Sequence, residues 1–193
     1  MQQNRFHTIQ EKCMIARFGR LAAATALVVA LPLTASAQST TFSKGDRVVS
    51  VGFMTGGDYD GSGVGVQAEW GLLPIGKTTL GIGGFIGYQS DDQGSGAFKA
   101  SWSALPVMAV ANLHFPIESQ PKLDLYAGAS IGFIRYGWDY AGTLPPGAVK
   151  SDTQSAIGFQ GGVRYWLGSR FGINGQLGLN DLPLLQAGVS LKF

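Results

Sequence analysis

The sequence predicts an all-β fold, an eight-stranded antiparallel up-and-down β-barrel that crosses a membrane. Three observations predict it. Apolar and weakly polar residues alternate with period two through eight segments, the connections between these segments differ in length in a regular way, and only 13% of the residues are charged. Period two places successive side chains on opposite faces of a strand. Because the second face carries mainly Gly, Ser, Asn and Gln, it fits a narrow barrel interior, and the apolar face fits lipid.

The N-terminal residues 1–37 are interpreted as a signal peptide that is cleaved. Two arginines precede an apolar run at 21–33, and Ala35 and Ala37 form an A-x-A cleavage pattern after it. The run is too short to span a membrane comfortably. A retained anchor helix is the alternative, and the proline and small residues that end the run argue against it.

Translation begins either at Met1 or at Met14, because both starts leave a complete signal peptide. The only cysteine, Cys13, lies upstream of the apolar run, so we expect a mature chain without thiols, disulfides or cysteine metal sites. Residues 1–37 contain four of the 14 basic and one of the 12 acidic residues, which leaves ten basic and eleven acidic residues, net −1. The positive charge of the whole chain therefore does not indicate a nucleic-acid partner.

A short N-terminal lead, residues 38–45, precedes one barrel domain predicted over residues 46–193. Pro106 lies inside an alternating segment, where proline cannot donate a ladder hydrogen bond, so we expect a bulge or a late strand start there. The segments are near the roughly nine to eleven residues of a tilted membrane strand, or slightly longer. The eight predicted strands cover residues 46–54, 64–72, 79–89, 101–115, 123–136, 154–167, 171–179 and 184–193.

The connections predict the orientation of the barrel. The second, fourth and sixth are short, whereas the first, third and fifth are longer and rich in Gly and Asp; the seventh is short and breaks the pattern. Short turns at one end and long loops at the other are typical of bacterial outer-membrane barrels, with both termini on the periplasmic side. We expect solvated loop carboxylates, no metal site, and a surface partner, if there is one, to bind through the loops.

The apolar face of the predicted strands carries almost no charge, as contact with lipid requires. Arg135 is an exception. It lies twelve residues beyond Leu123, roughly 40 Å along a strand, and should reach the outer headgroup zone, where it can meet lipid phosphate. Aromatic residues gather at both ends of the strands and predict two girdles. These are Trp70, Phe115, Tyr165, Phe171 and Phe193 near the short turns, and Tyr88, Trp102, Tyr136, Trp138 and Tyr140 near the long loops.

Four charged residues fall on the inward face, two or three residues from the periplasmic strand ends: Glu69, Asp124, Arg164 and Lys192. We expect them to form one polar layer across the narrow interior. The layer could act as a plug or gate. The simpler hypothesis is that the charges only satisfy one another, since a lone buried charge is costly whereas a buried pair adds little net stability.

The chemistry that the predicted mature chain could carry is limited. His114 is its single histidine, so sites that need two imidazoles are excluded. We predict a non-enzymatic protein without cofactor or metal, in a structural or surface-interaction role. A narrow channel or carrier for small solutes is the alternative, because many inward positions are glycine. A lipid A-modifying enzyme that uses His114 is the third hypothesis; the alternative, which we favour, is that His114 is a rim or lumen histidine without a catalytic role.

The segments GIGGFIGYQ and YAGASIGF and the ending LLQAGVSLKF resemble the small outer-membrane β-barrel family typified by the OmpA membrane domain and OmpX. The resemblance covers residues 46–193 and rests on pattern. It implies an eight-stranded barrel in the outer membrane of a Gram-negative-type bacterium, in contact with lipid and lipopolysaccharide. It also implies that the last strand, with Val189, Leu191 and the terminal Phe193, carries the signal read by the outer-membrane assembly machinery.

Overall fold

The structure is a computed structural model that describes residues 41–57, 61–93, 100–140 and 151–193. The predicted signal peptide, its cleavage residues Ala35 and Ala37 and the two candidate starts lie outside the described residues. The signal peptide and its cleavage therefore stay predictions.

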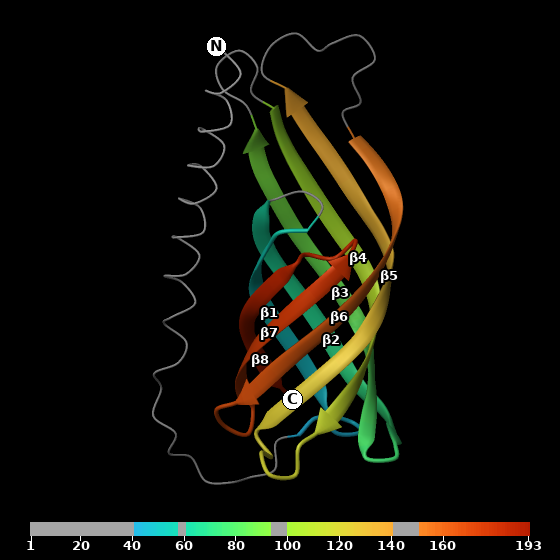
Figure 1. The fold of residues 1–193 in the computed structure, drawn as a ribbon, viewed down its shortest axis with the longest axis vertical. Coiled ribbons are helices and arrows are strands. Elements are labelled where there is room, and N and C mark those ends of the chain that lie inside the picture. The colour runs from blue at the N-terminus through green and yellow to red at the C-terminus, as the bar shows by residue number, and fades with distance from the viewer. Residues whose placement is uncertain (1–40, 58–60, 94–99, 141–150) are drawn as a thin grey trace, which may run out of the picture. The chain divides into compact units, whose positions relative to one another are not determined.

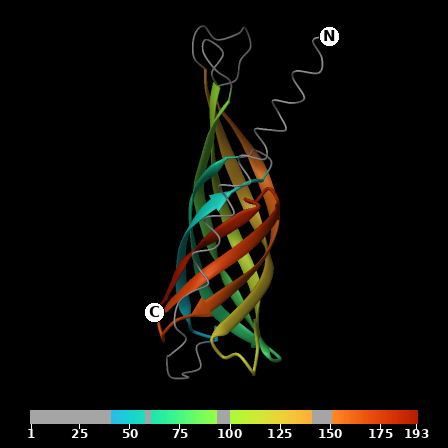
Figure 2. The same cartoon turned by 60° about the vertical axis from the view of Figure 1, so that its left-hand side comes forward.

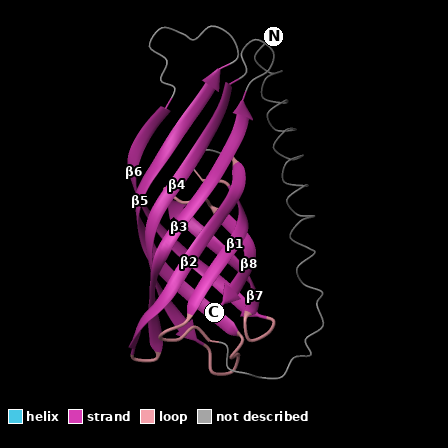
Figure 3. Ribbon diagram, turned by 180° about the vertical axis from the view of Figure 1, so that it is seen from behind, coloured by secondary structure: helices cyan, strands magenta, loops and turns pink. Residues whose placement is uncertain are grey.

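Eight strands close into a barrel in sequence order, each antiparallel to its neighbours, and the first pairs with the last (Figures 1 and 3). The predicted fold class is confirmed. Among the described residues, no helix is long and apolar enough to cross a membrane. The strands are β1 Arg47–Thr55, β2 Ser62–Ile75, β3 Thr78–Gln93, β4 Ala100–Pro116, β5 Leu123–Tyr140, β6 Ser151–Trp166, β7 Phe171–Asn180 and β8 Leu185–Lys192.

The two faces of the barrel wall have opposite character. Outward residues of alternate parity are apolar and exposed, such as Ile131 at 61% and Leu179 at 62%. Inward residues are buried and include both polar side chains, such as Gln67 and Asn112, and apolar ones, such as Met108 and Trp166. This distribution is the reverse of that in a soluble protein, where charged and amide side chains cover the surface. It follows from period two: one strand presents a lipid face and a lumen face in alternation.

The barrel wall is not equally high all round. Strands β3 to β6 have 16 to 18 residues, whereas β1, β7 and β8 have 8 to 10. At the loop end, β4, β5 and β6 therefore extend well beyond the β7–β8 hairpin (Figures 1 and 2). The β7–β8 turn contains Leu182, whose side chain is buried. The low part of the wall thus sends an apolar residue inward.

Two expectations for individual residues were wrong. Pro106 causes neither a bulge nor a late start: β4 begins at Ala100, and the register with β3 is the same on both sides of the proline. The register shift lies instead between Gly71 and Leu73 of β2. In the predicted outer girdle, Trp102 and Tyr136 are each only 6% exposed, because their parity turns them into the lumen rather than toward lipid.

Candidate functional site

Three of the four predicted inward charges meet in the periplasmic half of the barrel. The guanidinium of Arg164 donates through Nη1 to Asp124 Oδ2 at 2.9 Å and through Nη2 to Glu69 Oε2 at 3.0 Å. All three side chains are at most 2% exposed. Strand pairing explains one contact, because Asp124 lies directly opposite Arg164 on the neighbouring strand. Glu69 reaches Arg164 across the lumen from β2.

His114 is the residue that completes this cluster, and sequence reasoning did not assign it there. Its Nδ1 lies 2.8 Å from Asp124 Oδ1, and its Nε2 lies 3.3 Å from Glu69 Oε1. A doubly protonated ring donates from both nitrogens. In that protonation state an imidazolium and a guanidinium face two carboxylates, and the four side chains have no net charge. The sequence did contain a signal for its position, because the alternation along β4 places His114 on the inward face. We call Glu69, His114, Asp124 and Arg164 the ionic cluster.

Amide and hydroxyl side chains satisfy the remaining groups of the ionic cluster. Asn112 Nδ2 donates to Glu69 Oε1 at 2.6 Å, and Gln160 Nε2 donates to Asn112 Oδ1 at 2.8 Å. On the other side, Arg164 Nε donates to Ser190 Oγ at 3.1 Å. The carboxylates thus accept bonds from a guanidinium, an imidazole and an amide at once, which is what makes buried charge tolerable.

Lys192, the fourth predicted charge, meets the N-terminal segment. Its Nζ pairs with Asp46 Oδ2 at 3.0 Å and donates to the carbonyl oxygen of Thr41 at 3.2 Å. The ammonium also lies 4.7 Å from the ring centroid of Trp166. The prediction that all four charges form a single layer is therefore wrong for Lys192. This residue binds the N-terminal segment to the barrel and lies on the periplasmic side of the ionic cluster.

The described part of the N-terminal lead, residues 41–45, packs into the periplasmic mouth through Phe42. Phe42 is 4% exposed, packs with Val48 and Trp166, and stacks on the His114 ring with centroids 3.9 Å apart. Inward Gly81 makes the space, because a Cβ there would lie 3.1 Å from both Phe42 Cε1 and His114 Nε2. At this inward glycine an aromatic ring occupies the space that a side chain would take, so the glycine does not open the lumen.

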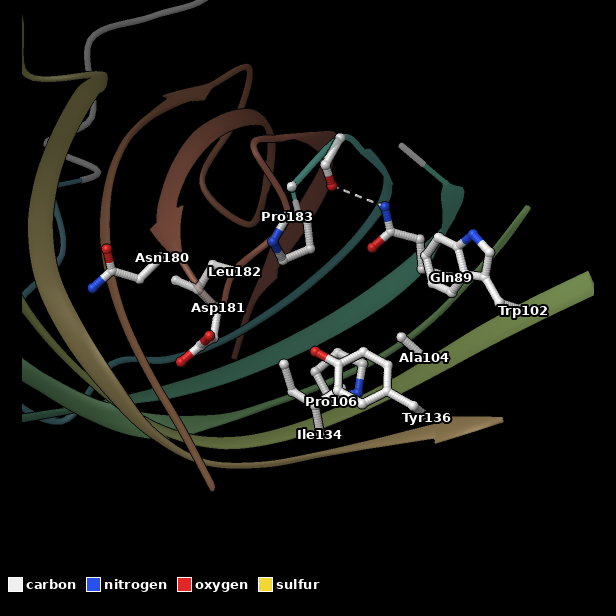
Figure 4. Close-up of a pocket in the computed structure, with 12 residues that line it drawn as sticks. Gln89, Trp102, Ala104, Pro106, Ile134, Tyr136, Asn180, Asp181, Leu182 and Pro183 are labelled. Carbon is white, nitrogen blue, oxygen red and sulfur yellow. Dashed lines mark hydrogen bonds between the residues drawn. The ribbon is translucent and has the colours of Figure 1, made fainter. Parts of the chain in front are cut away.

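An apolar layer lies in the outer half of the lumen. Its buried members are Met54, Phe85, Trp102, Ala104, Met108, Val110, Ile134, Tyr136, Ala156 and Leu182. Glycines again accommodate it: a Cβ at Gly65 would lie 2.7 Å from the ring of Phe85. Gln89, next to Trp102, donates to the Gly56 carbonyl at 3.0 Å, and both side chains line a cavity with Leu182 (Figure 4). The cavity among these residues has a volume of about 30 Å³, room for little more than a water molecule.

The lumen is thus occupied by three successive layers: the Phe42 segment, the ionic cluster and the apolar layer. Within the described parts of the chain, no group of three or more His, Cys, Asp or Glu side chains is arranged to hold a metal ion. The carboxylates of the ionic cluster are instead satisfied by cations and donors of the protein itself. What the arrangement does chemically is lock strands on opposite sides of the barrel together.

A closed ring of antiparallel strands, with an apolar exterior and buried charges in its interior, defines a small transmembrane β-barrel protein. Residues 22–193 match the family described as outer membrane protein beta-barrel domain, and the chain belongs to this family. It is a protein of the outer membrane of Gram-negative bacteria, in contact with the lipids there. Among curated proteins, none matches the sequence.

Solved structures resemble the chain at low sequence identity. OprG from Pseudomonas aeruginosa is 12% identical over 81% of this chain and 99% of its own, with a TM-score of 0.54. Ail, the attachment invasion locus protein of Yersinia pestis, is 13% identical over 77% of this chain and 95% of its own, with a TM-score of 0.48. Neisserial surface protein A is 15% identical over 77% and 96%, with a TM-score of 0.46. The likeness concerns the fold.

Proposed function

We propose that this protein is a non-enzymatic, non-conducting outer-membrane barrel with a structural or surface-interaction role. One observation carries the proposal: the charged side chains of the lumen are buried. Arg164 is 0% exposed and His114 1%. Water that passed through an open pore would touch such groups, and eight-stranded barrels in general have an interior that side chains fill.

Conductance tests this proposal against its alternative, a narrow channel or carrier for small solutes. The folded protein in planar bilayers should give no current steps, and proteoliposomes should not swell in small sugars or amino acids. Glu69→Gln and Arg164→Gln probe the ionic cluster. Discrete currents in the wild-type protein that change in these variants would establish a gated channel and contradict the proposal.

The absence of enzyme activity is proposed from the surroundings of His114. A lipid A-modifying site needs a base and a nucleophile that reach lipid near the outer leaflet. His114 instead lies in the periplasmic half of the lumen between two carboxylates, with Phe42 over its ring. Lipid A mass spectra of a deletion strain and its complemented parent should be identical. A mass difference that His114→Gln reproduces would overturn this part of the proposal.

The surface role is assigned to the loop end. Four carboxylates lie at the outer ends of strands β3, β5 and β6: Asp91, Asp92, Asp139 and Asp152. Together with Asp181 they give this end an acidic character. We propose that a surface partner binds here. Cells that express a chain with Asp91, Asp92, Asp139 and Asp152 replaced by Asn should lose partner binding but keep the folded barrel, as judged by its migration on unboiled gels.

The last strand is proposed to carry the assembly signal. Val189, Leu191 and Phe193 are on its outward face, with Phe193 73% exposed at the end of the chain. Deletion of Phe193 should reduce the amount of folded protein in the outer membrane. Phe171→Ala, which removes another exposed aromatic at the periplasmic end, is the matched control and should assemble normally. Equal assembly of both variants would show that Phe193 is not part of an assembly signal.

A further inference from the structure

A groove on the outer surface of the barrel is lined by residues of β1, β2, β3 and β4 and by Phe193. It has a volume of about 750 Å³, within the range of small-molecule sites. Strand register places its floor: Ala68 pairs with Gly84, and Gly84 pairs with Ala109, so three small outward residues follow one another across β2, β3 and β4. All three are exposed. The floor is therefore made of main chain and methyl groups.

Larger side chains border this floor. The next outward row toward the periplasm contains Trp70 paired with Ile82, which are 49% and 37% exposed. The next outward row toward the loops contains Val66 paired with Ile86, 38% and 50% exposed. The result is an apolar furrow across the strands, with the width of one residue row and no polar side chain on its outward floor.

A cation and two aromatics mark the periplasmic end of the groove. Arg47, the first residue of β1, pairs with Trp70 of β2, and its carbonyl accepts the backbone N–H of Phe193. All three residues line the groove. The Arg47 side chain is exposed, and among the described residues no carboxylate forms an ion pair with it. Two lysines near this end are paired: Lys192 with Asp46, and Lys77 with Glu118.

We propose that this groove is a binding site for one glycerophospholipid of the periplasmic leaflet. One acyl chain lies over Ala68, Gly84 and Ala109, and the phosphate pairs with Arg47 at headgroup level. A guanidinium binds phosphate with two parallel hydrogen bonds, and aromatic side chains favour the same interfacial depth. The groove ends at the periplasmic rim, so the occupant is a phospholipid and not lipopolysaccharide of the opposite leaflet.

Native mass spectrometry of the folded protein in detergent, with added phosphatidylglycerol, tests the site. Wild type should retain one phosphatidylglycerol through detergent release. Arg47→Gln should reduce this retention by up to about fivefold, the largest effect expected for an exposed ion pair. Arg170→Gln is the matched control, because Arg170 is an exposed arginine just before β7, and it should retain lipid as wild type does.

A second pair of variants tests the groove itself. Ala109→Leu fills the floor, whereas Ala129→Leu adds the same bulk at an exposed outward position of β5. Only Ala109→Leu should lower retention, and migration on unboiled gels checks that both variants fold. Diacylglycerol, which lacks phosphate, should be retained equally by wild type and Arg47→Gln. Equal losses in Arg47→Gln and Arg170→Gln, undiminished retention in Ala109→Leu, or stronger retention of lipopolysaccharide than of phosphatidylglycerol would each overturn the proposal.

Discussion

The ring of Phe42 stacks on the ring of His114 with centroids 3.9 Å apart and an interplanar angle of 23°. This contact joins the N-terminal lead to the ionic cluster and closes the periplasmic mouth. Phe42 belongs to a segment that is also held by Lys192, which donates to the Thr41 carbonyl and pairs with Asp46. The lead is therefore a structural part of the barrel.

Removal of this aromatic contact should weaken the barrel. Phe42→Ala is expected to lower the free energy of unfolding by about 3 kcal/mol, a typical cost of deleting a buried phenylalanine side chain. The temperature at which the unboiled, compact gel form is lost would measure it. Phe171→Ala removes an exposed, lipid-facing ring and should change this temperature much less. Equal shifts for the two variants would contradict the burial of Phe42 in the periplasmic mouth.

The guanidinium of Arg164 should be the most sensitive group in the lumen. Arg164→Met leaves Glu69 and Asp124 without their shared cation, and loss of one partner from a buried ion pair costs about 3–5 kcal/mol. Urea unfolding in lipid vesicles would show the decrease. Lys77→Met breaks the exposed pair with Glu118 and should cost under about 1 kcal/mol.

Charge balance predicts a partial rescue of that loss. In Arg164→Met the imidazolium of His114 faces two carboxylates, whereas adding Glu69→Gln leaves one cation and one anion. The double variant should therefore be more stable than Arg164→Met alone. If the two substitutions were additive in their cost, the residues would not act as one cluster.

The alternating strands could be predicted from the sequence because period two and the lipid environment act on every residue of the wall. All eight predicted strands appear, and apolar residues of their alternating pattern, such as Val51, Phe133 and Val189, are exposed. The same alternation predicted that Glu69 and Arg164 face the lumen, as they do in the structure. These features depend only on local backbone geometry.

Contacts across the lumen could not be predicted, because they depend on how the strands are staggered when the barrel closes. Period two says that His114 points inward, but not that its ring meets Glu69 of β2 and Asp124 of β5 together. Likewise, residues 38–45 lack strand periodicity and were expected as a short lead, although Phe42 is an internal packing residue. Trp102 shows the same limit: its position at a strand end indicates a girdle, yet its parity places it inside.

Larger side chains are predicted to occupy the space that glycines leave in the lumen. A Cβ at Gly158 would meet the Leu182 side chain and lie 3.0 Å from Ser130 Oγ. Gly158→Val should therefore push the β7–β8 turn outward and cost about 1–3 kcal/mol, read from the gel transition temperature. Adding Leu182→Ala should restore part of the loss. Gly175→Ala, where a new Cβ meets nothing within 4 Å, is the control and should fold normally.

Charge on the outer wall should be tolerated only near the membrane surface. Ile131, 61% exposed in the middle of β5, is expected to lie in the hydrocarbon, so Ile131→Lys should cost about 2–4 kcal/mol. Ile75→Lys, at the periplasmic end of β2, should cost no more than about 1 kcal/mol. The free energy of unfolding in vesicles measures both costs. Equal costs would show that the depth of a charge in the membrane does not determine its effect on stability.

Tryptophan quenching tests most directly whether lipid surrounds the apolar wall and packed side chains fill the lumen. Trp70 faces outward and is 49% exposed, whereas Trp166 faces inward and is 0% exposed. Two variants that keep one of these tryptophans, with Phe at the other tryptophan positions, would be folded into vesicles with brominated acyl chains. We predict strong quenching of Trp70 and almost none of Trp166, either by the bromines or by aqueous iodide. Quenching of Trp166 by iodide, or of Trp70 by iodide and not by bromine, would contradict the account.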